Sequence, residues 1–87
     1  MAMTQELIHT HDREIVGPGK VPEDKLKEIL TRVASRHGVK CEITDWHQSK
    51  KTSVLRYHLE GGEDSIEKVK ADLKNELKPL GCDEGAA

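Results

Sequence analysis

Residues 39–60, VKCEITDWHQSKKTSVLRYHLE, decide the fold, because they contain two alternating segments separated by a polar turn around residues 48–51. The apolar and small residues of the first segment have odd numbers: Val39, Cys41 and Ile43. Those of the second segment do as well: Ser53, Leu55, Tyr57 and Leu59. Alternation with a period of two is typical of strands that bury one face. We therefore predict a β-hairpin with one apolar face and one polar face.

The alternation also constrains the register of this hairpin. Both apolar sets lie on one side only if the numbers of paired residues have an even sum, as when Cys41 lies opposite Tyr57. The other face is called the open face, because no helix is expected to cover it. In this register the open face carries Trp46, Arg56 and His58.

Two amphipathic helices flank the hairpin in the sequence. Residues 22–37 carry one apolar stripe at helical spacing, formed by Leu26, Ile29, Leu30, Val33 and Ala34. A second stripe follows the hairpin and is formed by Ile66, Val69, Leu73, Leu77 and Leu80. Asp64 and Glu67 stand in the positions of a capping box, so we expect Asp64 to cap the second helix. That helix carries one row of lysines, expected to be solvated and paired with nearby acids: Lys70, Lys74 and Lys78.

The N-terminal residues 4–16, TQELIHTHDREIV, have an extended pattern. Their apolar residues have both odd and even numbers, so they do not all lie on one side of a single regular strand. We favour one strand over about residues 4–11, and a hairpin that turns near His11 and Asp12 is the alternative. Residues 1–3 are expected to form a disordered start and residues 82–87 a flexible tail. A single α+β domain is then predicted over residues 4–81.

These elements follow the order β-α-β-β-α, and each has one apolar side. Two helices packed on one face of a three- or four-stranded, mainly antiparallel sheet would bury all of these sides together. A right-handed crossover through the first helix makes strand one parallel to strand two, with strand three between them. The arrangement resembles a ferredoxin-like sandwich that lacks its last strand. This resemblance concerns architecture and implies no function.

The composition limits the classes of function. The chain has 87 residues, 34% of them charged, and a net charge of −2. Bulk attraction to nucleic acid or to acidic membranes is therefore not expected. The two cysteines lack the spacing of a metal or redox motif. No apolar run approaches the length of a membrane-spanning helix, about 18 residues. Both observations favour a cytoplasmic protein with no membrane partner. The supply of Leu, Ile and Val is small, which favours self-association through an exposed edge or the open face.

The pair His9 and His11 is the first candidate site. Positions i and i+2 on a strand point the same way and could present two imidazoles to a metal ion. The segment is similar to the metal-binding first strand of the amidohydrolase barrels, but those barrels need about 250 residues. His58 could complete a three-ligand site if its strand lay beside the first. We nevertheless expect two solvated histidines, with no native metal and no cofactor.

The open face is the second candidate site. Its residues are Trp46, Arg56 and His58, with Lys50 and Lys51 in the adjoining turn. A tryptophan among cations could stack a base or another planar ligand, or anchor a protein partner. No nucleophile motif and no carboxylate pair stands out, so we assign no catalytic residues and expect no enzyme.

The sequence therefore predicts a small non-catalytic binding or interaction module of unknown partner. Its contact surface is expected to be the open face around Trp46. A domain that binds RNA or single-stranded DNA through the same face is the alternative. A metal-dependent site on the pair His9 and His11 is the second alternative.

Overall fold

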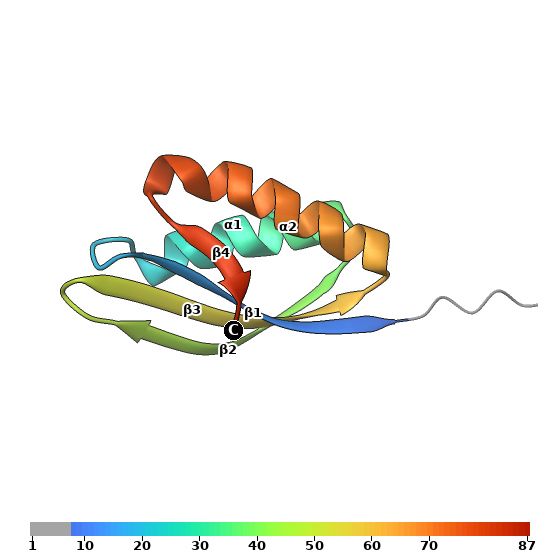
Figure 1. Ribbon diagram of the computed structural model, residues 1–87, viewed down its shortest axis with the longest axis horizontal. Coiled ribbons are helices and arrows are strands. Elements are labelled where there is room, and N and C mark those ends of the chain that lie inside the picture. The colour runs from blue at the N-terminus through green and yellow to red at the C-terminus, as the bar shows by residue number, and fades with distance from the viewer. Residues whose placement is uncertain (1–7) are drawn as a thin grey trace, which may run out of the picture.

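The computed structural model describes residues 8–87, and in it two helices pack side by side on one face of a sheet (Figure 1). The elements are β1 (His9–Pro18), α1 (Glu23–Arg36), β2 (Lys40–Gln48), β3 (Thr52–Gly61), α2 (Glu63–Leu77), the 3-10 helix η1 (Lys78–Leu80) and β4 (Asp83–Ala86). The predicted fold class, two helices on one face of a mainly antiparallel sheet, is confirmed. The start predicted at residues 1–3 lies outside the described residues.

The sheet has the order β2-β3-β1-β4, and every neighbouring pair of strands is antiparallel. Because β1 and β2 both pair with β3, they run parallel to each other with β3 between them. This is the arrangement expected from a right-handed crossover through α1. The sheet thus has two edges, formed by β2 and by the short strand β4.

The N-terminal segment forms one strand that is longer than predicted. β1 pairs with β3 over ten residues, from His9 opposite Gly61 to Pro18 opposite Thr52. The strand predicted over residues 4–11 continues to Pro18, the hairpin alternative is wrong, and residues 4–7 lie outside the described residues. The apolar residues of β1 have both odd and even numbers because they lie on both faces: Ile15 is buried in the core (0% exposed), and Val16 lies on the open face opposite Val54.

One detail of the predicted sandwich is wrong, because the last strand is present. Asp83–Ala86 form β4 within the segment expected to be a flexible tail, and this strand pairs with residues 13–16 of β1. Gly81, at a φ of 72°, follows η1 and turns the chain from α2 back onto the sheet. Cys82 and Glu84 are then buried (4% and 7% exposed), which attaches the segment to the domain.

The core lies between the sheet and the two helices, and both predicted helical stripes contribute to it. Its fully buried members include Leu26, Leu30, Val33, Ile66, Val69, Leu73 and Leu77 from the helices, and Ile15, Leu55 and Leu59 from the sheet. The predicted capping box does not form, because Gly62 takes the N-cap position of α2 without a side-chain hydrogen bond. Asp72 joins the helices by accepting hydrogen bonds from His37 (2.6 Å) and Arg36 (3.3 Å), which hold the pKa of Asp72 below its ordinary value.

A β-bulge between Ile43 and Asp45 divides the β2–β3 hairpin into two registers. Before the bulge, Cys41 pairs with Leu59, which has the predicted even sum, although the predicted partner Tyr57 lies two residues away. After the bulge the sum is odd, because the extra residue on β2 has no partner on β3. The bulge therefore moves the later side chains of β2 to the faces opposite those predicted.

Trp46 is the residue that this shift affects most. It pairs with Leu55, which is 0% exposed, and packs, partly buried, against the core. The prediction that Trp46 lies on the open face is therefore wrong. The bulge places Asp45 and His47 on that face instead, opposite Arg56 and Val54.

The fluorescence of Trp46, the only tryptophan, tests this placement directly. We expect its emission to move to longer wavelength on unfolding and its quenching by acrylamide to become severalfold stronger, because unfolding exposes the ring to water. Steady-state quenching of native and urea-unfolded protein measures both effects. If the native protein is quenched as strongly as free N-acetyltryptophanamide, the ring lies in solvent and the bulged register is incorrect.

Candidate functional site

The structure brings only part of the predicted open-face site together. Arg56 and His58 lie on the open face of β3, and Lys50 and Lys51 lie, exposed, in the turn beyond it. Trp46 lies on the face that the helices cover. A planar ligand therefore cannot contact Trp46 and Arg56 from the same side of the sheet.

The two cationic candidates of β3 already have partners on β1. Arg56 Nε lies 3.6 Å from Glu14 Oε1, and His58 Nδ1 lies 2.9 Å from Asp12 Oδ1. The open face also carries more acids on its strands, namely Glu42, Asp45, Glu60 and Asp83. The face as a whole is thus richer in acids than in bases, which weakens its attraction for a polyanion.

The histidine pair does not meet its predicted third ligand. His9 and His11 lie opposite Gly61 and Leu59, on the face that the helices cover, whereas His58 lies on the open face. His9 Nε2 instead lies 3.9 Å from Glu63 Oε2. Within residues 8–87 no group of three or more His, Cys, Asp or Glu side chains could hold a metal ion. The metal-dependent site built on these three histidines is therefore wrong.

A buried charged triad that the sequence did not suggest connects β1, β3 and β4. Arg13 donates hydrogen bonds to Glu84 from Nε (2.5 Å) and from Nη2 (2.8 Å), and Tyr57 donates its hydroxyl hydrogen to Glu84 Oε2 (3.0 Å). The side chain of Glu84 is 0% exposed and that of Arg13 is 13% exposed. A carboxylate buried this deeply is stable only with such partners.

The triad raises the pKa values of two of its members, Arg13 and Tyr57. The hydrogen bond to Glu84 raises the pKa of Arg13 above its ordinary value, so the guanidinium stays charged. Desolvation, and then the charge of Glu84, raise the pKa of Tyr57 far above that of a free phenol. Because Tyr57 stays neutral and keeps donating, the triad acts as a structural connection rather than as a proton carrier.

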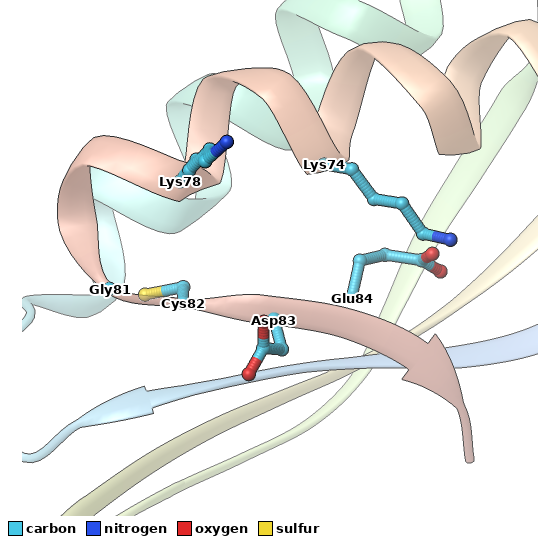
Figure 2. A pocket seen from close by; sticks show the side chains of 6 residues that line it. All are labelled: Lys74, Lys78, Gly81, Cys82, Asp83 and Glu84. Carbon is cyan, nitrogen blue, oxygen red and sulfur yellow. The ribbon is translucent and has the colours of Figure 1, made fainter.

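Beside this triad, a cavity of about 350 Å³ lies between the C-terminal half of α2 and β4 (Figure 2). Its lining residues are Lys74, Lys78, Gly81, Cys82, Asp83 and Glu84. Lys74 extends from α2 toward the carboxylate of Glu84, whereas Lys78, one helical turn further along, has its amino group turned along α2 and away from β4 (Figure 2). The side chain of Asp83 points away from α2, because this residue faces the other side of the sheet. Two lysines of α2 therefore line one side of the cavity, and the amino group of Lys74 is the one directed toward β4.

Lys74 and Lys78 differ from the third lysine of their row in their acidic partners. Lys70, in the same row, lies 3.3 Å from Glu67 and so has the expected acidic partner, although its side chain is only 19% exposed. In contrast, Lys74 and Lys78 have no carboxylate within 4.0 Å in the described part of the chain. Glu84 does not neutralise them, because Arg13 and Tyr57 already use both of its oxygens. A negatively charged ligand would supply the missing charge.

The cavity offers binding groups but no activated nucleophile. Burial raises the pKa of the Cys82 thiol, which keeps the sulfur protonated at neutral pH. Burial likewise raises the pKa of Cys41 to about 11. Lys74 and Lys78 are both exposed to solvent. The arrangement can bind an anion by charge and hydrogen bonds.

The element order β-α-β-β-α-β, the strand order 2-3-1-4 and the helices on one face define a ferredoxin-like sandwich. Among solved structures, the chain is similar to CPII, a nitrogen regulatory PII-like protein from Thiomonas intermedia K12, whose structure holds ADP, AMP and bicarbonate. The sequence identity is 12% and the TM-score 0.57, over 95% of this chain and 89% of that one. At this identity the likeness shows the fold alone.

The other comparisons give no relative. No protein-family model matches the chain, and no curated protein matches it either. Within residues 8–87, none of the helices has the length and the apolar character needed to span a bilayer.

Proposed function

We propose that this protein is a small, non-catalytic binding module that holds a small anionic ligand in the cavity between α2 and β4. The observation that carries the proposal is the pair Lys74 and Lys78, two lysines without acidic partners in the described part of the chain that line a cavity of about 350 Å³. Cavities of roughly 300–1,000 Å³ are typical of sites for small molecules. The ligands of the structurally similar PII-like protein, ADP, AMP and bicarbonate, are all anions, which supports this class of ligand.

The geometry also favours a ligand that carries its charge at one end. The two lysines lie on the α2 side, while the buried thiol of Cys82 lies on the β4 side and offers a less polar surface. A phosphate or carboxylate group would contact the lysines, and the remainder of the ligand would lie along β4. Because both lysines are exposed, water and salt weaken the contact, and we expect moderate affinity.

Titration of the protein with ADP, AMP and bicarbonate tests this proposal. We expect saturable heat in calorimetry for at least one of the three, with amide NMR shifts centred on residues 74–84. Lys74→Gln and Lys78→Gln should each weaken binding about three- to tenfold, because each removes one charged contact. Binding should also weaken as the salt concentration rises.

Lys68→Gln is the matched control for this experiment. Lys68 is an exposed lysine of α2 that does not line the cavity, so its replacement changes the net charge equally and should leave the affinity unchanged. The proposal fails if none of the three anions binds saturably. It also fails if Lys68→Gln weakens binding as much as Lys74→Gln, because the attraction would then be nonspecific.

Binding of RNA or single-stranded DNA through Lys50, Lys51, Arg56 and His58 is our alternative proposal. One observation favours it: Gly19 packs against the backbone of Ser49 and Lys50, so that Lys20 joins the lysines of the turn at one end of the molecule. The pairing of Arg56 and His58 with acids, and the inward position of Trp46, give it less support than the cavity. A titration with short single-stranded RNA should show a steep salt dependence if this alternative is correct. Self-association stays a prediction.

A further inference from the structure

A second, smaller hollow lies on the open face between β2 and β3, with a volume of about 200 Å³. It is lined by Asp45, His47, Val54 and Arg56. Two of these residues, Asp45 and His47, reach the open face only because of the β-bulge between Ile43 and Asp45. Bulges occur often next to functional sites, where they redirect side chains.

The opposite charges in this hollow are held apart. Asp45 and Arg56 are directly opposed across the two strands, a position in which acid and base usually attract each other. Their side chains nevertheless form no ion pair within 4.0 Å in the described residues. Asp45 Oδ1 accepts a hydrogen bond from the backbone N–H of Trp46 (2.9 Å), and Arg56 Nε turns toward Glu14 Oε1 (3.6 Å).

Each of the two charged groups therefore keeps binding capacity for a ligand. The second oxygen of Asp45 and the terminal nitrogens of Arg56 have no hydrogen-bond partner within residues 8–87. The guanidinium can hold a carboxylate with two parallel hydrogen bonds. The free carboxylate oxygen of Asp45 can accept a hydrogen bond from an ammonium group, and Val54 supplies an apolar surface between them.

We propose that this hollow binds a small zwitterion, a free α-amino acid with a short aliphatic side chain. Its α-carboxylate would contact Arg56, its α-ammonium group Asp45, and its side chain Val54. A simple anion would be repelled by Asp45 and a simple amine by Arg56, so both charges of the ligand are needed. The volume of about 200 Å³ is sufficient for a ligand of this small size.

L-Valine and two analogues that each lack one charged group test the proposal. Isovalerate lacks the amine and isobutylamine lacks the carboxylate, while both keep the branched side chain. In an amide NMR titration we expect saturable shifts with L-valine, centred on Asp45, His47, Val54 and Arg56. Because the hollow is small and open to water, we expect millimolar affinity, and each analogue should bind about tenfold more weakly or not at all.

Variants then show whether the charges of the hollow are responsible. Arg56→Gln and Asp45→Asn should each weaken L-valine binding about tenfold, and Asp45→Asn keeps an oxygen for the hydrogen bond from Trp46. Glu42→Gln, an acid on the same face of β2 outside the hollow, is the matched control and should bind as the unaltered protein does.

Three results would overturn the proposal. They are the absence of saturable shifts with L-valine, equal binding of isovalerate and L-valine, and an equal loss in Glu42→Gln and Asp45→Asn. The experiment is independent of the cavity between α2 and β4. Lys74→Gln should leave L-valine binding unchanged, so the two sites succeed or fail separately.

Discussion

Replacing Glu84 by Gln is expected to destabilise the protein by about 3–5 kcal/mol, the range found when one partner of a buried ion pair is removed. The side chain of Glu84 is 0% exposed and that of Arg13 only 13%, so little water can reach the guanidinium once its partner is neutral. Tyr57 would lose its charged acceptor in the same step. A chain of this length is stable by roughly 0.05–0.15 kcal/mol per residue, so this loss is a large part of the total.

Urea unfolding followed by circular dichroism measures the loss, with Asp83→Asn as the control. Asp83 is the neighbouring acid on β4, but it is exposed and faces the open side, so its change should stay within about 0.5 kcal/mol. Combining Arg13→Met with Glu84→Met should recover part of the stability, because no unpaired charge is then buried. A loss below about 1 kcal/mol in Glu84→Gln would show that the triad is not a main stabilising contact.

Gly19→Ala is expected to cost about 1–3 kcal/mol, although Gly19 does not lie in the core. A methyl group at this position would lie 2.4 Å from the carbonyl oxygen of Ser49 and 2.5 Å from that of Lys50, which are backbone atoms. The loop before α1 would have to move away from the β2–β3 turn. Gln48 Nε2 donates hydrogen bonds to the carbonyl oxygens of Gly19 (2.6 Å) and Val21 (3.2 Å), and this movement would break them.

Gly85→Ala is the matched control for this prediction. No atom lies within 4 Å of the methyl group that it adds, and its φ is not positive, so we expect a change within about 0.5 kcal/mol. Thermal unfolding compares the two variants, and amide NMR locates the change. The shifts of Gly19→Ala should gather on residues 17–22 and 48–52. Equal stability of the two variants would mean that the loop and the turn do not touch in solution.

The sequence predicts those parts of the fold that bury a periodic apolar pattern. The stripe of α1 and the alternation of β3 each have one periodicity, and each element lies where that pattern indicates. β4 has no such pattern, since DEGA contains one small apolar residue, and it forms because Glu84 meets Arg13 and Tyr57. An acid in the core cannot be recognised before its partners are known.

The cavity between α2 and β4 could not be predicted for a similar reason, because it depends on β4. The row Lys70, Lys74 and Lys78 is visible in the sequence, but the space below Lys74 and Lys78 exists only because β4 closes it. The bulge before Asp45 does leave a signal in the sequence, because strict alternation through ITDWH would put Asp45 on the apolar face and Trp46 on the polar face, and one extra residue exchanges them. This single unpaired residue moves Trp46 inward and brings Asp45 and His47 beside Arg56, which changes the chemistry of the open face.

The triad also has a consequence for the order in which the chain acquires its structure. Arg13 and Glu84 are separated by 71 positions, so the contact between them closes a loop that contains both helices and the hairpin. During synthesis, β1 is made before its counter-charge, which follows on β4 after both helices and the hairpin. Until Glu84 has left the ribosome, Arg13 of the inner strand β1 lacks its carboxylate partner. Long-range closures of this kind slow folding, so docking of β4 is expected to complete the domain rather than to begin it.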